Sequence, residues 1–298
     1  MIGQMQITSS GAIRDKIETA IQRLKAFEPP EGYYVAFSGG KDSQCVYHLC
    51  KLSGVKFDAH YSVTSVDPPE LVRFIKDNYP DVQFERQYYP DGKPITMWNL
   101  IPKKKMPPTR INRYCCEKLK EAGGKGRITI TGVRWAESVN RKLKQDVVLI
   151  KNPGRKGIKI AEQSEADYRI NSANGIVLND DNDKVRRMVE QCYRTKKTLI
   201  NPIIDWEDDD VWFFLNEICK VQHCCLYDEG YKRIGCIGCP MNHNQRKELE
   251  KYPKFKEAYM RAFERMIAAR KENGLNGHEM MDDFWEKPED VMRWWLGD

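Results

Sequence analysis

The stretch YYVAFSGGKDSQCVYHL, residues 33–49, decides the fold, because an apolar run passes through a glycine pair into a helical pattern. Residues 33–37 are short, apolar and aromatic, which is typical of a buried strand. From Gln44 onward the apolar residues recur at close to helical spacing. Between the two, glycines allow a sharp turn and leave backbone N–H groups bare, and a helix N-terminus adds partial positive charge. With the full charge of Lys41 added, the stretch predicts a phosphate-binding loop.

The residues around the glycine pair separate the possible interpretations of this loop. A Walker-type loop is excluded, because it needs four residues between its first glycine and its Gly-Lys-Ser/Thr. An ordinary strand-to-helix turn is an alternative, since paired glycines are common in turns. Two serines, a lysine and an aspartate beside the glycines favour phosphate binding over such a turn.

The composition is that of a globular protein. The chain has 298 residues, of which 31% are charged and 41% hydrophobic, enough for one large domain or a domain with an appendage. No apolar run approaches the length of a membrane span, and the first residues lack the apolar core of a signal peptide. We therefore expect a cytoplasmic protein with no membrane partner. The net charge of +6 permits a polyanionic partner without requiring one.

Apolar runs beyond the loop continue the alternation of strand and helix. Short β-branched or aromatic stretches predict further strands at 55–63, 82–89 and 127–135, with helical patterns between them. This alternation predicts an α/β fold with a doubly wound, mostly parallel sheet. In such a sheet ligands bind at the carboxyl ends of the strands, so the loop and residues 132–134 should share that edge.

Other segments have less regular patterns. Residues 90–114, rich in Pro, Lys and Arg, predict an irregular segment, and residues 145–200 fit the alternation poorly. Asp205 is the expected N-cap of the helix that follows it. Residues 245–272 predict one long amphipathic, basic helix.

Four of the ten cysteines have the pattern of a metal site. Cys115 and Cys116 are adjacent, and Cys236 and Cys239 form a Cys-x-x-Cys, whose turn brings two sulfurs together. Four thiolates suit zinc or an iron–sulfur cluster. Taken separately, the Cys-x-x-Cys could be a dithiol redox pair and the adjacent pair two small buried residues. Alternative ligands are His223, Cys224 and Cys225.

Five pieces of the chain follow one another over about residues 33–240 and together indicate a family. They are SGGKDS, CCEKLK, TGVRWAESVNRK, NPIIDWEDDDVW and LYDEGYKRIGCIGCP. In this order they resemble the phosphoadenosine phosphosulfate (PAPS) reductase family, which belongs to the adenine nucleotide alpha hydrolase (PP-loop) superfamily. The resemblance implies a Rossmann-like nucleotide-binding fold. It also implies a 4Fe–4S cluster beside the nucleotide.

The resemblance gives a role to each matching residue. It implies that the nucleotide phosphates are held by Ser38, Gly39, Gly40, Lys41, Asp42, Ser43, Gly132 and Arg134. It implies that the cluster ligands are Cys115, Cys116, Cys236 and Cys239. Lys41, Asp42 and Arg134 are the expected catalytic residues, ATP or an adenylyl sulfate (APS or PAPS) the nucleotide, and Mg²⁺ the ion near Asp42. For Arg134, a surface ion pair with Glu137 is the alternative interpretation.

The same resemblance implies a division of the chain. Residues 1–215 would form the nucleotide-binding domain, with an insertion at about 150–195. Residues 216–298 would form a helical C-terminal region that carries the Cys-x-x-Cys.

One departure from the reductases decides the expected activity. Reductases of this family use a C-terminal cysteine as nucleophile, whereas no cysteine follows Cys239 here. The segment most similar to the reductase motif is NGLNGHEMM at 273–281, and it has no thiol. We therefore expect an ATP pyrophosphatase-type sulfurtransferase that modifies nucleic acid, by phosphorothioation or thiolation, through an adenylated intermediate. An assimilatory APS or PAPS reductase that releases sulfite is the first alternative. A non-catalytic nucleotide- or nucleic-acid-binding subunit with a structural cluster is the second.

The expected partners follow from this chemistry. They are the nucleotide, DNA or RNA, a cysteine desulfurase or other sulfur donor, and a second copy of the chain in a homodimer. Basic segments at 101–114 and 151–159 could follow a polyanion, although solvated charged loops are equally consistent with them. The sequence does not identify the acceptor, the sulfur donor or the oligomeric state. It also leaves zinc as an alternative to the iron–sulfur cluster.

Overall fold

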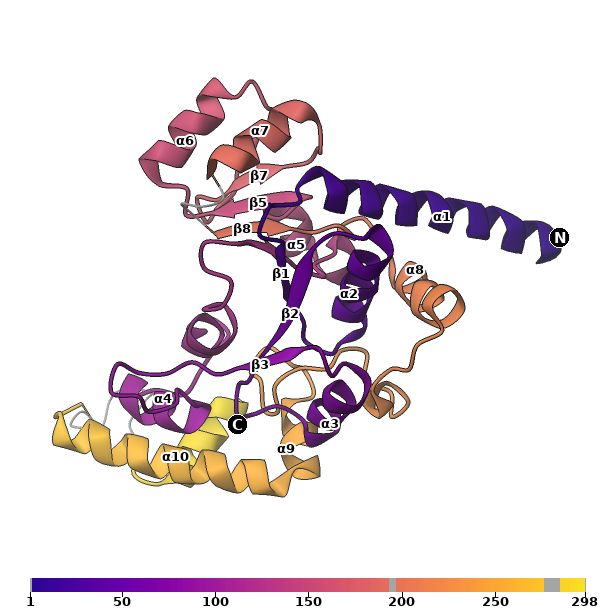
Figure 1. Cartoon of the computed structure of the whole chain (residues 1–298). Helices are drawn as coiled ribbons and strands as arrows, with labels where there is room; N and C mark the ends of the chain where they lie inside the picture. The colour runs from indigo at the N-terminus through magenta and orange to yellow at the C-terminus, as the bar shows by residue number, and fades with distance from the viewer. Residues whose placement is uncertain (1, 193–196, 276–284, 298) are drawn as a thin grey trace. The chain divides into compact units, whose positions relative to one another are not determined.

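The structure is a computed structural model that describes residues 2–192, 197–275 and 285–297 (Figure 1). The chain divides into two compact units that interleave along the sequence. Unit 1 comprises Met1–Tyr61, Phe74–Gln83 and Gly124–Cys225, and unit 2 comprises Ser62–Arg73, Phe84–Gly123 and Leu226–Asp298. The predicted division near residue 216 stays a prediction, because compact units that interleave along the sequence do not test a single boundary between two consecutive domains. Most of the NGLNGHEMM stretch lies outside the described residues.

An eight-stranded sheet in the order β3-β2-β1-β4-β8-β5-β7-β6 is the scaffold of the fold (Figure 1). The strands are β1 Tyr33–Ala36, β2 Phe57–Ser62, β3 Gln83–Glu85, β4 Ile128–Ile130, β5 Val148–Lys151, β6 Arg169–Ile170, β7 Ile176–Leu178 and β8 Lys197–Ile200. β1 runs parallel to β2 and to β4, and β4 runs parallel to β8. This confirms the predicted α/β fold with a mostly parallel, Rossmann-like sheet.

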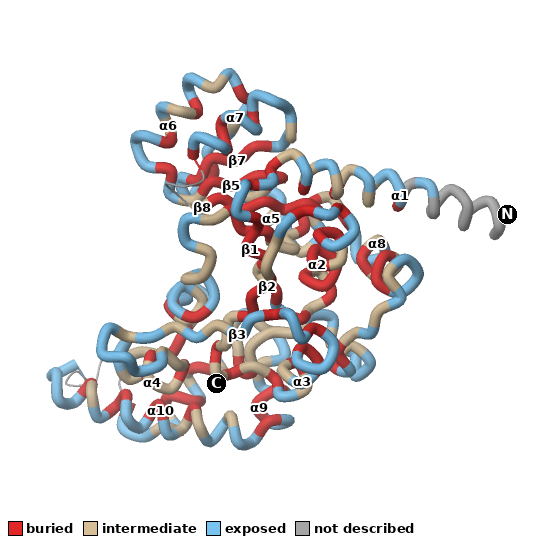
Figure 2. The backbone as a smooth tube through the Cα atoms, in the orientation of Figure 1, coloured by how far each residue is buried: buried red, intermediate tan, exposed pale blue. Residues whose placement is uncertain are grey.

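An antiparallel flank completes the sheet in unit 1, in the region that fits the sequence pattern poorly. β5 runs antiparallel to β8 and to β7, and β6 runs antiparallel to β7. The apolar residues of β5 and β7 are buried, as Figure 2 shows by colour. The segment therefore extends the parallel sheet by antiparallel pairing, which needs no helical crossover between neighbouring strands.

The helices begin and end at recognisable signals. They are α1 Ile2–Ala26, α2 Lys41–Ser53, α3 Pro69–Asn78, α4 Met97–Lys104, α5 Val139–Lys144, α6 Gly154–Gln163, α7 Asp183–Cys192, α8 Asp208–Phe213, α9 Gln245–Lys251, α10 Pro253–Glu272 and α11 Pro288–Leu296. The short helical turns are η1 Cys116–Lys120, η2 Trp135–Glu137, η3 Phe214–Cys219 and η4 Cys225–Tyr227. α2, for example, follows an extended Gly40 and ends at Gly54 in the left-handed conformation, which glycine adopts without strain.

Unit 2 has a helical core of its own. α4 and α10 lie side by side in it (Figure 1). Its buried residues include Ile101, Ile237, Tyr259 and Trp295, and Cys115 and Cys236 pack against the same cluster. Two of the four candidate cluster ligands are therefore partly buried against the core of this unit.

Three local predictions are wrong for identifiable reasons. The segment 90–114 contains α4, which Thr96 caps by accepting a hydrogen bond from the Asn99 N–H. The basic helix predicted at 245–272 is two helices, because Pro253 cannot continue the hydrogen bonding of α9 and starts α10 instead. The N-cap of α8 is Glu207 rather than Asp205, with Asp210 completing a reciprocal capping box.

No helix in the described part of the chain is both long enough and apolar enough to cross a membrane.

Candidate functional site: an anion cradle and four thiols

The loop after β1 forms a closed turn in unit 1. Gly39 has φ +72°, a conformation that favours glycine, and Gly40 is extended and immediately precedes α2. Ser43 Oγ accepts a hydrogen bond from the Ser38 N–H at 3.1 Å and donates one to Gly40 O at 2.9 Å. The turn therefore presents the N-terminus of a 13-residue helix, where unpaired N–H groups and the helix dipole favour an anion.

Gly132 lies at the carboxyl end of β4, pressed against this helix. A Cβ atom added to Gly132 would lie 2.7 Å from Asp42 O and 2.8 Å from Asp42 C. Backbone atoms cannot move aside as a flexible side chain can. Gly132 is therefore required for the close approach between the first turn of α2 and the segment that carries Arg134.

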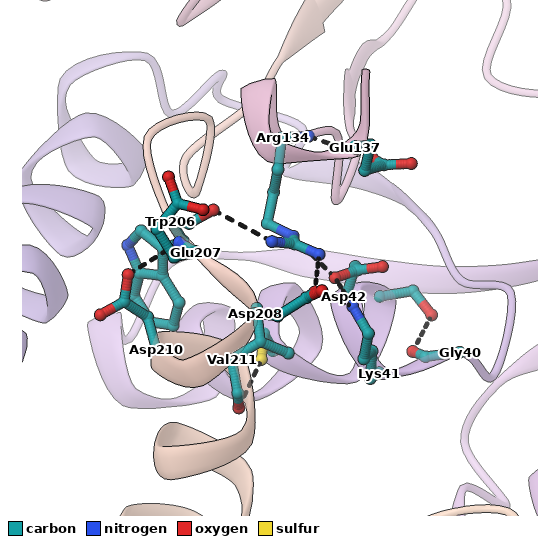
Figure 3. Close-up of polar contacts among 12 residues, drawn as sticks. Gly40, Lys41, Asp42, Arg134, Glu137, Trp206, Glu207, Asp208, Asp210 and Val211 are labelled. Atoms are coloured by element: carbon teal, nitrogen blue, oxygen red, sulfur yellow. Dashed lines mark hydrogen bonds and ion pairs between the residues drawn. The ribbon is translucent and has the colours of Figure 1, made fainter. Parts of the chain in front are cut away.

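Two cations and two carboxylates alternate beside the loop (Figure 3). Arg134 donates from Nε to Asp42 Oδ1 at 2.8 Å and from Nη2 to Asp208 Oδ1 at 2.7 Å. Lys41 Nζ donates to the same two oxygens, at 3.0 and 2.8 Å. The remaining arginine nitrogen, Nη1, donates to Trp206 O at 3.0 Å. The Oδ1 atom of each aspartate thus accepts two charge-assisted hydrogen bonds, one from Lys41 and one from Arg134.

The environment keeps this network ionised. The side chain of Arg134 is only 2% exposed. Burial lowers the pKa of Arg134, but the charges of Asp42 and Asp208 outweigh it and the net shift is upward. The hydrogen bonds from Lys41 and Arg134 lower the pKa of Asp208. Both shifts favour the charged forms of Arg134 and Asp208.

The surface ion pair considered for Arg134 is not what the structure contains. Its guanidinium is buried and points to Asp42 and Asp208. Glu137 instead accepts a hydrogen bond from the backbone N–H of Arg134 at 3.2 Å and forms an ion pair with Arg141 at 3.3 Å.

Asp208 is a site residue that the sequence reasoning missed. It lies in NPIIDWEDDDVW, where four acidic residues follow Trp206 in a row. Their number concealed which one faces the loop. The N-cap at Glu207 places Asp208 at the first helical position, and only the fold brings that position to Lys41 and Arg134.

The candidate cluster cysteines all lie in unit 2. Cys116 begins the π-helical turn η1, directly after Cys115. Cys236 and Cys239 bracket a turn in which the Cys239 N–H donates to Cys236 O at 3.2 Å. The structure thus brings both halves of the predicted set into one compact unit. The cradle lies in the other unit, and a cavity shared by the two sites stays a prediction.

Buried side chains brace the Cys-x-x-Cys turn. Glu248, 3% exposed, accepts from the Gly238 N–H at 3.2 Å and from Asn242 Nδ2 at 2.6 Å. Gln245 donates to Gly238 O at 3.1 Å, and the Tyr259 hydroxyl donates to Ile237 O at 3.0 Å. Polar groups of the turn are therefore paired with side chains from two helices, α9 and α10.

Cations and neighbouring thiols act on the four sulfurs. Cys116 accepts hydrogen bonds from the Cys115 thiol and from Arg113, the latter at 3.3 Å, and these lower its pKa well below the ordinary value. The bond that Cys115 donates raises the pKa of Cys115, as do the nearby Cys236 and Cys239. Burial raises the pKa of Cys236, and the charge of Lys120 opposes that shift.

The donor set suits an inorganic cluster by its chemistry. All four thiols lie in one unit, Arg113 and Lys120 carry positive charge near them, and cations stabilise the negative charge of thiolate ligands. In the described part of the chain, no three or more His, Cys, Asp and Glu side chains are grouped so that they could hold a metal ion. A cluster and zinc both remain predictions. Of the alternative ligands, Cys224 is buried, Cys225 is exposed, and the His223 ring lies edge-on to Trp212.

Comparison with known proteins identifies the family. Residues 32–242 match the phosphoadenosine phosphosulfate reductase domain, a span that contains both the cradle and the four cysteines. The chain belongs to the PAPS reductase family, a member of the PP-loop superfamily. It is also similar to the uncharacterized protein MJ0973 of Methanocaldococcus jannaschii, with 25% identity over 264 residues, or 84% of this chain. The chain spans about half the length of that relative, since the match covers 50% of it.

Proposed function

We propose that this protein splits ATP between its α and β phosphates at the Ser38–Ser43 loop and directs sulfur to a nucleic acid. The match over residues 32–242 places the chain in a family of nucleotide-binding, sulfur-related enzymes.

The alternating network of Lys41, Asp42, Arg134 and Asp208 is the observation that carries the proposal. Two carboxylates beside an anion cradle would repel nucleotide phosphates by themselves. Carboxylate oxygens are, however, the ligands that Mg²⁺ prefers, and Mg²⁺ normally accompanies ATP. An adenylyl sulfate needs no such ion. The acidic half of the network therefore supports ATP over APS or PAPS, with Asp42 and Asp208 as the residues that would hold the ion.

The proposed chemistry is an exchange of leaving groups. An acceptor oxygen attacks the α-phosphorus, the bond to the bridging oxygen breaks, and pyrophosphate leaves with that electron pair. The acceptor oxygen, now esterified with AMP, is a good leaving group. A sulfur nucleophile from a donor then attacks the acceptor atom, and AMP leaves with the oxygen. Lys41, Arg134 and the loop N–H groups would stabilise the charge that develops on the phosphates, and Mg²⁺ would supply further charge neutralisation.

The four thiols would hold a 4Fe–4S cluster in unit 2. When bound, such a cluster supplies iron to which sulfur can bind or through which electrons can pass. The protein's own contribution is to present Cys116 as a thiolate next to Arg113 and to hold the Cys236–Cys239 turn rigid through Glu248 and Tyr259.

Pyrophosphate release tests this proposal. Anaerobically purified protein is incubated with α-labelled ATP, Mg²⁺, single-stranded DNA or RNA and sodium sulfide as the sulfur nucleophile, and pyrophosphate and AMP are measured. We expect both products from the natural chain. Lys41→Met should lose at least 100-fold in rate, while the exposed Arg187→Ala on α7 serves as matched control. Release of ADP and phosphate, or no turnover with any acceptor, contradicts the proposal.

Membership of the family favours sulfite release as a second candidate function. Sulfite formed from PAPS or APS with reduced thioredoxin, without turnover of ATP, would establish a reductase. Nucleotide binding with no turnover of either substrate would instead indicate a binding subunit.

A further inference from the structure

A groove on unit 2 combines an aromatic ring with two arginines. It has a volume of about 420 Å³ and lies between α4 and α10, which run side by side in Figure 1. Its lining residues are Trp98, Ala258, Arg261, Glu264 and Arg265. Arg265 donates from Nη2 to Trp98 O at 2.7 Å, which holds its guanidinium beside the groove. Trp98 is half-buried, and its ring rests edge-on against Tyr259 at 5.1 Å.

The helices on both sides of this Trp98 groove are strongly basic. Together α4 and α10 contain eight Lys and Arg against three Glu, a net charge of +5, compared with +6 for the whole chain. All of these cations are exposed except Arg270, and in Figure 2 exposed and buried residues alternate along α10. Arg261 and Arg265 are one helical turn apart, about 6 Å along the axis, so they can contact successive charges of one ligand. The charge of this surface is complementary to a polyanion.

The groove connects to the cysteine turn through one side chain. Tyr259 contacts Trp98 with its ring and donates from its hydroxyl to Ile237 O, inside the Cys236–Cys239 turn. Trp98 of the groove and the Cys236–Cys239 turn therefore both contact one buried tyrosine of the same unit. All residues of the groove and of the turn belong to unit 2.

We infer that the Trp98 groove binds single-stranded nucleic acid, with a base stacked on Trp98 and phosphates on Arg261 and Arg265. Aromatic rings inside a basic groove are the means by which proteins bind single strands without reading their sequence, because every base has a stacking face. An acidic peptide would match the arginines but would not need the tryptophan. The inference rests on the proposed function only in taking nucleic acid as the acceptor, and it names where unit 2 holds that acceptor.

Fluorescence anisotropy with a labelled 12-nucleotide strand, DNA and RNA in turn, tests the inference on the full chain without ATP. Trp98→Ala should weaken binding about tenfold, and Trp98→Phe, which keeps a ring, should weaken it less. Arg261→Ala combined with Arg265→Ala should reduce the slope of log K against log salt by about 1.4, since each phosphate contact to a single strand contributes about 0.7. The matched control is the double change Arg186→Ala and Arg187→Ala on α7 of unit 1, which should leave affinity and slope unchanged.

One further variant has the opposite sign and guards against loss of folding. Glu264→Gln removes a carboxylate from the groove and should strengthen binding about twofold, which a damaged protein would not do. The inference is overturned if the strand does not bind, if duplex binds more tightly than single strand, or if the α7 control lowers affinity as much as the groove variant. Because ATP is absent, strand binding with these dependences supports the groove even if pyrophosphate release fails.

Discussion

Replacing Arg134 by methionine tests whether the cradle is one coupled electrostatic unit. Methionine keeps most of the apolar stem but removes three hydrogen bonds, to Asp42, Asp208 and Trp206 O. It also leaves two carboxylates facing each other with only Lys41 between them. Breaking a buried charge pair costs about 3–5 kcal/mol. Because the side chains of Asp42 and Asp208 are 25% and 69% exposed, water lowers the cost, and we expect about 3 kcal/mol.

The measurement is a double-mutant cycle in urea. Unfolding of the natural chain, Arg134→Met, Asp208→Asn and the double variant is followed by far-ultraviolet circular dichroism. In the double variant the repulsion between Asp208 and Asp42 is absent. It should therefore be more stable than the sum of the single changes predicts, by about 1 kcal/mol.

A matched arginine decides the interpretation of the cycle. Arg187 on α7 is exposed, so Arg187→Ala should change the free energy of unfolding by less than about 0.5 kcal/mol. The reasoning is refuted if Arg134→Met is no more costly than this control, or if the two single changes simply add. A nucleotide arm completes the test: Mg²⁺–ATP at 100 times its dissociation constant stabilises a binding protein by about 2.7 kcal/mol, and Arg134→Met should lose most of that gain.

Three other perturbations have outcomes fixed by single contacts. Gly132→Ala should destabilise the protein by several kcal/mol and abolish its stabilisation by ATP, because the new Cβ would lie 2.7 Å from Asp42 O. Calorimetry with and without nucleotide measures both effects. Values near those of the natural chain would contradict the close approach. Because its pKa is lowered in the folded protein, Asp208 contributes fully to the free energy of unfolding above its unfolded pKa of about 3.9, and this contribution is lost as pH falls through the lower folded value. In an acid titration, Asp208→Asn should therefore lose less stability below about pH 4 than the natural chain. Parallel curves for the two proteins would contradict this role of Asp208. Glu248→Ala removes the acceptor that holds the Cys-x-x-Cys turn and should reduce the absorbance of the anaerobic protein near 400 nm. Glu248→Gln keeps an acceptor and should retain more of this absorbance. Equal spectra would show that the carboxylate does not position the thiols.

Local signals in the sequence were enough for the class of fold and for the loop. The apolar run at 33–37, the glycine pair and the helical spacing after it are each contained within a few residues, so their physical effect needs no distant partner. The Cys-x-x-Cys is likewise recognised from four consecutive residues, although side chains of α9 and α10 hold its turn in the structure. The composition of the segment 90–114, rich in proline and lysine, predicts no helix, whereas Thr96 caps α4 there. Composition alone does not report such a cap.

Only the tertiary structure decided which charges meet. Asp208 lies 167 residues from Lys41 and 74 from Arg134, and four adjacent acidic residues are equivalent in sequence until the capping box at Glu207 sets their rotation around α8. The Trp98 groove likewise joins α4 to a helix more than 150 residues later. Sequence patterns report the periodicity of one segment, whereas an electrostatic contact depends on distances across a sheet or between helices, and those are fixed only when the whole core packs.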